Sequence, residues 1–294
     1  MEKRLIEPHL GIVTINYLNW RDTVEMVKSL QKQSFQSFHL VIVDNHSGNG
    51  SFQKLSEFYS DDQQITLLET SENLGFAKAN NLGINFLKKN YDLYKIFMIN
   101  NDLLFQDDNY LSKLMHFKYK KNVGAIGTNI LTKTGVQQNP VFEQTNLVRV
   151  MHQSLYFNLF FVFRLKNIFF NRFMKIPHNK VSHQRNIANS KSEFFLHGSA
   201  ILFTENYLKC SVGFFPGTFL YFEENILKII FDKLSLKMVF TPIAGLYHKE
   251  DQSSKIANQD NSFKIKCLSV SSRKALILKF LPVFFVKDLI RDNK

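Results

Sequence analysis

The residues with the clearest chemical potential are Asn100, Asn101 and Asp102, which directly follow the apolar run 96–99. An abrupt change from apolar to amide and carboxylate side chains is typical of a buried strand that ends at a ligand site. Ligands bind at the carboxyl ends of strands in open α/β sheets. One carboxylate flanked by amides would suit a hard divalent cation that also takes oxygens from a diphosphate. The same residue types form Asx turns, and this segment alone does not decide between the two interpretations.

Two earlier apolar runs end in the same way, because residues 10–15 stop at Asn16 and residues 40–43 stop at Asp44. An aspartate accepts hydrogen bonds from imide N–H groups and from hydroxyls, so this pair could hold a base and a ribose. Gly75 opens a predicted helix, where a glycine permits a tight turn and backbone N–H groups can bind a phosphate. A plain turn before an amphipathic helix explains that glycine more simply.

A third candidate group lies near the end of the chain, where the aromatic run 219–222 precedes the adjacent carboxylates Glu223 and Glu224. Apolar surroundings raise the proton affinity of a carboxylate, which suits a general base that contributes ~10²–10⁴ in rate. The alternative is a solvated helix start, where the helix dipole favours acidic residues. His248 ends an apolar segment as Asp102 does, although a lone histidine is more often structural than a ligand.

Composition limits the class of protein. The chain has 294 residues, 45% of them hydrophobic, which is enough for a sizeable core. The formal net charge of +12 favours an anionic partner. Two cysteines cannot form a disulfide framework and indicate a reducing compartment. The first residues lack the apolar region of a signal peptide, and no uncharged apolar run reaches the ~18 residues of a spanning helix.

Strands alternate with helices through the first 127 residues, which predicts a parallel sheet with right-handed crossovers. After residues 123–127 the alternation is lost, and residues 128–200 read as irregular. The predicted strands are 10–15, 40–43, 65–68, 94–99 and 239–242, and the predicted helices are 20–33, 51–59, 76–89 and 224–233.

The order of these motifs resembles the inverting glycosyltransferase family two, over roughly residues 9–250, and is most similar to its bacterial rhamnosyltransferase-like branch of capsular, O-antigen or cell-wall polysaccharide synthesis. Each piece alone is weak, but their order and spacing together are specific. The pieces are Thr14-Ile15-Asn16-Tyr17, Ile42-Val43-Asp44-Asn45-His46-Ser47, Asn73-Leu74-Gly75-Phe76-Ala77, Asn100-Asn101-Asp102, Phe219-Leu220-Tyr221-Phe222-Glu223-Glu224 and Tyr247-His248.

The resemblance implies an α/β protein with the GT-A fold, a Rossmann-like, mostly parallel sheet flanked by helices. It implies a divalent metal cofactor, Mg²⁺ or Mn²⁺, and a general base at Glu224. The implied site residues are Thr14, Asn16 and Asp44 on the nucleoside, Asn73, Gly75 and Asn80 along the nucleotide and sugar, Asn101 beside the ribose or diphosphate, and Asp102 and His248 on the metal.

The chain departs from the family pattern at two places. The aspartate-x-aspartate element has one carboxylate here, at Asp102, which lowers the expected metal affinity. The base of the family is the aspartate of a Glu-Asp pair, and the chain has Glu224 there, followed by Ile226 where a second acidic residue is usual. The base assignment is therefore open between Glu223 and Glu224, and we favour Glu224.

The resemblance further implies a nucleotide-sugar-binding half at residues 1–127, an acceptor-side half at 128–254 and an amphipathic tail at 255–294. The expected partners are a nucleoside-diphosphate sugar, a glycan or polyprenyl-diphosphate-linked acceptor and an anionic membrane surface, with no nucleic acid; the oligomeric state is left open. The expected location is cytoplasmic, peripheral on the inner face of the cell membrane.

Two phenylalanine-rich, basic stretches, 155–175 and 273–287, predict interfacial amphipathic helices, the second split by Pro282. Packing on the enzyme or on a second protomer is the alternative for both. Two other functions remain open: a catalytically weakened, membrane-bound nucleotide-sugar binder, which the missing carboxylates suggest, and a nucleic-acid-binding protein. The last lacks an RNP, zinc-finger or helix-turn-helix signature.

Overall fold

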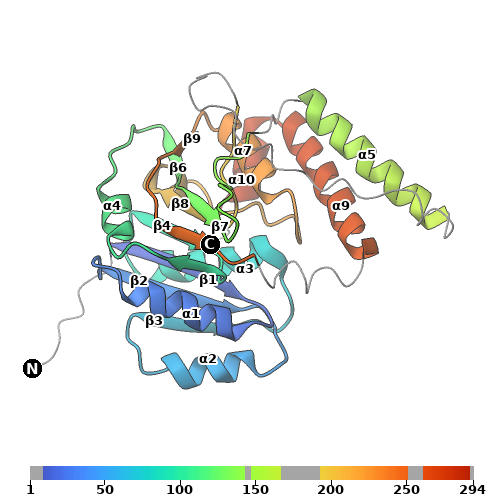
Figure 1. Ribbon diagram of the computed structural model, residues 1–294. Helices are drawn as coiled ribbons and strands as arrows, with labels where there is room; N and C mark the ends of the chain where they lie inside the picture. Colours follow the sequence, from blue (N-terminus) through green and yellow to red (C-terminus); the bar gives the residue numbers. More distant parts are fainter. Residues whose placement is uncertain (1–8, 143–146, 167–192, 251–260, 292–294) are drawn as a thin grey trace, which may run out of the picture.

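The computed structural model describes residues 9–142, 147–166, 193–250 and 261–291. A seven-stranded sheet forms its centre (Figure 1), and two hydrophobic cores cover its two faces. In sheet order the strands are β3 (Ile65–Glu69), β2 (Phe38–Asp44), β1 (Leu10–Asn16), β4 (Lys95–Ile99), β8 (Ala200–Thr204), β6 (Val123–Gly127) and β9 (Lys237–Phe240).

The first half of the chain builds the parallel part of this sheet, as predicted. β1 pairs in parallel with β2 on one side and with β4 on the other. Helix α1 (Trp20–Gln31) covers one face and α3 (Gly75–Asn90) the other. The shorter helices are α2 (Ser51–Tyr59), α4 (Tyr110–His116) and α6 (Glu205–Leu208). The predicted α/β class with a mostly parallel sheet is confirmed.

Strand β8 is the main departure from the predicted organisation. It lies between β4 and β6 and is antiparallel to both. All five of its residues are buried, and such a short apolar run has no period that marks it as a strand. Through β8, β6 and β9, residues on both sides of position 128 contribute to one sheet. The large sheet is therefore not divided near residue 128. That residues 1–127 bind the nucleotide sugar and residues 128–254 the acceptor stays a prediction.

A second, three-stranded sheet lies beside the end of β4. It contains β5 (Leu103–Phe105), β10 (Leu246–His248) and β7 (Ile130–Thr132). β10 is antiparallel to β5, with His248 opposite Leu103. This register brings the end of β10 next to Asp102, the residue before β5.

The C-terminal part is helical. Helix α7 (Glu223–Lys233) packs on α9 (Asn261–Phe280), and α9 lies alongside α5 (Leu147–Lys166) (Figure 1). Pro282 separates α9 from α10 (Val283–Ile290), as predicted. Residues 167–175 of the first predicted amphipathic stretch lie outside the described residues. Among the helices that are described, none has the length and hydrophobicity needed to cross a membrane.

Candidate active site

Three neighbouring strands, β2, β1 and β4, deliver polar side chains to one edge of the large sheet. At the end of β1, the Asn16 amide Nδ2 donates to Asp44 Oδ2 at the end of β2 (2.6 Å) and to Ser47 Oγ (3.2 Å). The backbone N–H of Ser47 donates to Asp44 Oδ1 (2.9 Å), and its hydroxyl to Oδ2 (2.8 Å). The predicted pair Asn16 and Asp44 is thus joined, and both side chains are buried.

The network continues from β1 to the residues after β4 through helix α1. Thr23 on α1 donates from Oγ1 to Asn16 Oδ1 (2.8 Å), and Asn101 Nδ2 donates to Thr23 Oγ1 (2.9 Å). Hydrogen-bonded polar groups inside a protein are held rigidly, because leaving one unpaired is costly. The Asn-Asn-Asp segment therefore has a fixed position relative to the ends of β1 and β2.

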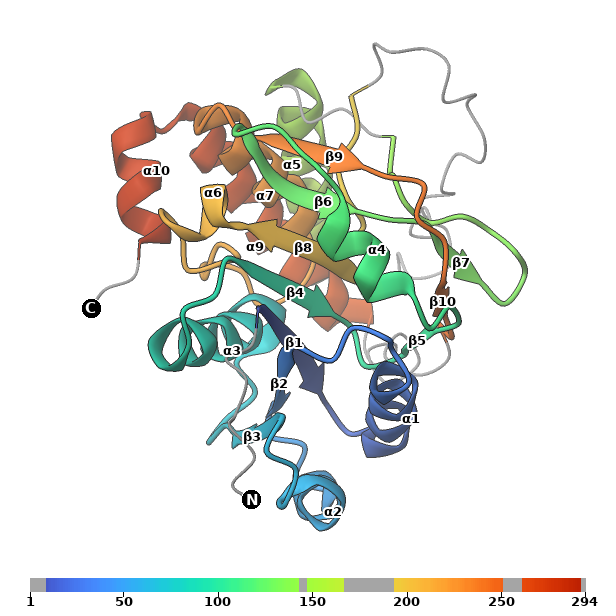
Figure 2. The same ribbon diagram turned by 90° about the vertical axis from the view of Figure 1, so that its left-hand side faces the viewer.

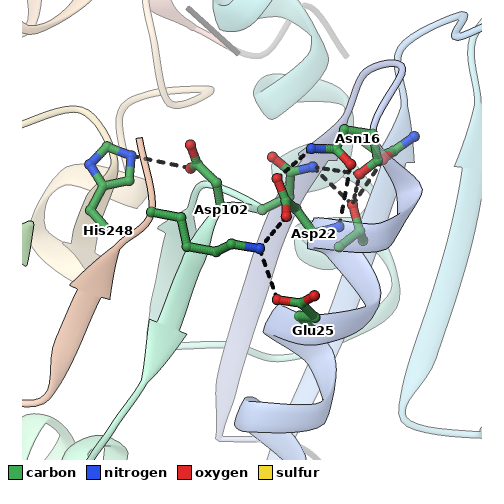
Figure 3. Close-up of polar contacts among 9 residues, drawn as sticks. Asn16, Asp22, Glu25, Asp102 and His248 are labelled. Atoms are coloured by element: carbon green, nitrogen blue, oxygen red, sulfur yellow. Dashed lines mark hydrogen bonds and ion pairs between the residues drawn. The ribbon is translucent and has the colours of Figure 1, made fainter. Parts of the chain in front are cut away.

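Asp102 and His248 face one another across the junction of the two sheets (Figure 3). Asp102 Oδ1 lies 3.2 Å from His248 Nε2, and the residues are 3% and 8% exposed. The contact does not have the geometry of a hydrogen bond, and Oδ1 is buried without any hydrogen-bond partner. A buried oxygen in this condition is rare in folded proteins.

A divalent cation fits this pair. A carboxylate oxygen and an imidazole nitrogen are both common metal ligands, and the remaining positions of Mg²⁺ or Mn²⁺ are usually filled by water and substrate phosphates. The cation would satisfy the buried Oδ1 atom. Within the described ranges, no group of three or more His, Cys, Asp or Glu side chains is arranged to hold a metal.

The start of helix α3 is organised by two asparagines. Asn73 Oδ1 accepts from the Gly75 N–H and from Asn45 Nδ2 (2.9 Å each), and Asn45 Oδ1 accepts from the Leu74 N–H (2.8 Å). The Phe76 N–H donates to the Phe219 carbonyl. These backbone donors are engaged within the chain, so they differ from the free phosphate-binding N–H groups that the sequence suggested.

Gly75 itself is explained by this packing. Its φ is +75°, and a Cβ atom there would lie 2.2 Å from the Phe219 carbonyl oxygen. Only glycine permits both the left-handed backbone and such a close approach. Gly75 thereby joins the start of α3 to the loop that leads into Glu223 and Glu224.

That loop enters α7 through a strained backbone. Tyr221 and Phe222 both have φ of +70°, a conformation that costs an L-residue roughly 1–2 kcal/mol. Strain of this kind persists where the surrounding structure enforces it, and it is frequent at functional sites. Here it sets the direction in which the two glutamates leave the helix start.

Glu224 lies against the segment that precedes β8. The Gly198 N–H donates to Glu224 Oε1 (3.1 Å), and a Cβ atom on residue 198 would lie 2.3 Å from that oxygen. The neighbours of Gly198 lie near the candidate metal pair. The His197 ring lies 6.0 Å from the His248 ring, and the Ser199 carbonyl accepts from the Asn100 N–H. Burial, and then His248, lower the pKa of His197 to about 4.

Glu223 has different surroundings. It is buried, and its Oε1 atom has no hydrogen-bond partner. Burial, and then the neighbouring Glu224 carboxylate, raise the pKa of Glu223 to about 8. This is the raised proton affinity expected for a carboxylate in aromatic surroundings, and it means that Glu223 is mostly neutral at pH 7.

Two further predicted nucleoside and sugar contacts are also buried, each with an unpaired side-chain oxygen. Thr14 is fully buried in β1 with Oγ1 unpaired, and Asn80 is buried in α3 with Oδ1 unpaired. Their roles stay predictions. Sequence reasoning gave no role to several residues that organise this edge of the sheet. Two of them, His197 and Gly198, precede a buried strand and could have been noticed. The others carry no local signal in the sequence: Thr23, Gln138, Lys249 and Glu250.

Comparison with known proteins gives a family. The family model described as Glycosyl transferase family 2 matches residues 11–188. The glycosyltransferase GlyG of Streptococcus pneumoniae serotype 4 (strain ATCC BAA-334 / TIGR4) is 28% identical over 82 residues. That alignment spans 28% of this chain and about a quarter (27%) of the length of that relative.

Solved structures share the fold. The mannosyltransferase PcManGT from Pyrobaculum calidifontis, in complex with GDP-Man and Mn²⁺, has a TM-score of 0.54 at 13% identity, covering 93% of this chain and 73% of that one. Residues 1–349 of S. aureus TarS give 0.52 at 14% identity, with 90% and 71% covered, and TarS is also known with UDP-GlcNAc. GalNAc-T7 with UDP, GalNAc and Mn²⁺ gives 0.54 at 10% identity, with 83% and 44% covered.

At such low identities these likenesses show the fold alone, and that fold is the GT-A fold. The family match is independent of them and rests on the sequence. Since it extends over more than half of the residues, the chain belongs to glycosyl transferase family 2.

Proposed function

We propose that this protein is an inverting glycosyltransferase that moves a sugar from a nucleoside-diphosphate donor to an acceptor hydroxyl. The observation that carries the proposal is the arrangement of two groups with different chemical roles, a metal-ligand pair and a carboxylate base. The unsatisfied Asp102 Oδ1 faces His248, and Glu224 is anchored on Gly198, whose neighbour His197 lies beside the His248 ring. A leaving-group site and a general base are what inversion at an anomeric carbon requires.

The chain's own residues have distinct roles in this proposal. Asp102 and His248 would hold Mg²⁺ or Mn²⁺; when bound, the cation supplies Lewis-acid stabilisation of the leaving diphosphate. Asn16 and Asp44 would hold the nucleoside, with Asn101 at the ribose or diphosphate and Asn73, Gly75 and Asn80 along the nucleotide and sugar. Glu224 would take the proton from the acceptor hydroxyl as its oxygen attacks the face opposite the leaving group.

The substrates are inferred from the resemblance noted in the sequence. The rhamnosyltransferase-like branch makes a rhamnose-like sugar the first donor to test, and a glycan or polyprenyl-diphosphate-linked molecule the first acceptor. The structural neighbours that carry GDP-Man, UDP-GlcNAc and Mn²⁺ support a nucleotide sugar and a divalent metal as ligand classes.

The donor and the metal are tested together. We expect one member of a panel of nucleotide sugars to raise the thermal unfolding midpoint when Mn²⁺ is present, because a ligand that binds only the folded state stabilises it. Transfer from that donor should fall at least about tenfold in Asp102→Ala, in His248→Ala and in excess EDTA. Full activity in EDTA would exclude a metal-assisted reaction. Binding without release of nucleoside diphosphate would favour the weakened-binder alternative.

The base is tested by removing basicity while keeping size. We expect Glu224→Gln to lower turnover by ~10²-fold or more with donor affinity nearly unchanged, because the base acts in the transition state. Glu223→Gln should act mainly through acceptor affinity or folding. Turnover and donor affinity measured for both variants decide the assignment. It is reversed if Glu223→Gln is inactive with intact donor binding while Glu224→Gln turns over normally.

The buried Glu223 also predicts a pH dependence of stability. Its folded pKa of about 8 exceeds the ordinary value of 4.5. The stability it contributes is therefore fully present below about pH 4.5 and is lost as the pH rises through about 8. The side chain of Glu223→Gln cannot ionise. The free energy of unfolding of this variant, minus that of the wild type, should therefore be larger at about pH 9 than at about pH 5. Urea unfolding at both pH values measures this, with the exposed Glu69→Gln as control; a constant difference would contradict the buried, protonated state.

For the location of the protein, we infer peripheral contact with the inner face of the cell membrane. Support comes from α9 and α10, where Phe280, Phe284 and Phe285 are 63%, 68% and 54% exposed. Val286 and Ile290 occupy the opposite, buried side of α10. Figure 2 shows α10 across the molecule from β5 and β10, so contact there would leave the candidate site open. The flanking cations are Arg273, Lys279, Lys287 and Arg291.

The exposed phenylalanines and flanking cations of α9 and α10 predict that the protein sediments with anionic vesicles at low ionic strength and that salt weakens this binding. Each cation near such a membrane adds about 1 kcal/mol to the binding free energy. The double variant Phe284→Ser and Phe285→Ser should stay in the supernatant. Phe58→Ser, which changes a 49% exposed phenylalanine on α2, should sediment like the wild type. If the wild type does not sediment, membrane contact is refuted; equal sedimentation of all three would refute the role of α10.

A further inference from the structure

Gln138 connects His248 to Glu250. It lies after β7, where its backbone N–H donates to the Ile130 carbonyl, and its side chain is buried. Gln138 Oε1 is 2.6 Å from His248 Nδ1, and Gln138 Nε2 donates to Glu250 Oε1 at 2.5 Å. The three side chains thus form a short series of hydrogen bonds that ends at the His248 imidazole.

The negative charge of Glu250, at one end of these three side chains, determines which ring nitrogen of His248 carries a proton at the other end. A carboxylate only accepts hydrogen bonds, so the Gln138 amide must turn its NH₂ group toward Glu250 and its carbonyl oxygen toward His248. Turning the amide over would place two acceptors against one another. Because the carbonyl oxygen also only accepts, His248 must carry a proton on Nδ1.

A neutral histidine with its proton on Nδ1 has a lone pair on Nε2. In that form Nε2, 3.2 Å from Asp102 Oδ1, has no proton to donate, and the carboxylate oxygen has none either. Two acceptors at this distance are satisfied together by a cation. Metal-binding histidines in general donate their second ring N–H to such a partner, which fixes the ring and its tautomer.

We infer that Gln138, held by Glu250, is a positioning residue that fixes His248 in the Nδ1–H tautomer and thereby makes Nε2 a ligand for a divalent cation. The inference rests on the metal site of the proposed function. Its support is rigid, because the neighbouring Asn139 donates to the Thr128 carbonyl and accepts from the His197 N–H.

Loss of Gln138 should switch the ring to its other tautomer. Without an acceptor at Nδ1, the proton can move to Nε2, next to the Asp102 carboxylate, where it occupies the nitrogen that would bind the cation. Gln138→Met keeps the length of the side chain and removes both hydrogen bonds. The double variant Gln138→Glu with Glu250→Gln keeps an acceptor toward His248 and a donor between positions 250 and 138, so it is the matched control.

The tautomer is measured directly, without metal, from the ¹⁵N shifts of the His248 ring in protein labelled at histidine. His248→Ala identifies the signals. We expect the Nδ1–H form in the wild type and in the double variant, and the Nε2–H form in Gln138→Met. An Nδ1–H ring in Gln138→Met, with the folded structure verified by circular dichroism, would overturn the inference.

The consequence for the metal is measured with Mn²⁺ alone, from the loss of the EPR signal of the free ion. Gln138→Met should bind Mn²⁺ about ten- to a hundredfold more weakly than the wild type, and the double variant should recover most of this loss. Unchanged affinity in Gln138→Met would refute the positioning role. Equal binding by wild type and His248→Ala would instead refute the metal site of the proposed function, so the two failures are distinguishable.

Discussion

The antiparallel pairing of β4 with β8 is the constraint on which the candidate site depends. Its register places Ile99 opposite Ala200, and the ladder continues one step further, from the Asn100 N–H to the Ser199 carbonyl. Asp102 follows β4, and Gly198, which holds Glu224, precedes β8. A single pairing therefore sets Asp102, the proposed metal ligand, against the segment that holds Glu224, the proposed base. A slip of one residue would turn the side chains of one strand to the opposite face.

Much of this arrangement could be predicted from the sequence, because it depends on local patterns. The helix over 51–59 has the predicted bounds, and the other predicted strands and helices of the first half differ by a few residues at their ends. Apolar runs that stop at Asn16, Asp44 and Asn100 marked the strand ends correctly, since a buried strand and its polar terminus are adjacent in the chain.

What sequence reasoning missed depends on contacts between distant residues. β8 is a buried apolar run without a period, and its antiparallel direction is set by its pairing with β4 and β6. Gln138 reaches His248 across 110 residues, and no neighbouring pattern distinguishes it from other polar residues. The internal bonds of the α3 start were also missed, because Asn45 and Phe219 come from other parts of the fold.

The charges around Asp102 bear on the proposed metal site, which has one carboxylate where the family pattern has two. Lys249 directly follows His248, and its backbone N–H donates to the Asp102 carbonyl. A lysine beside a divalent cation would repel it, but Lys249 Nζ bonds Asp22 and Glu25 on α1 instead (Figure 3). Its charge is thereby paired away from Asp102 Oδ1. In the proposed site a divalent cation would meet a single protein carboxylate, and the donor diphosphate would supply the further negative charge, so metal and donor affinity should be coupled.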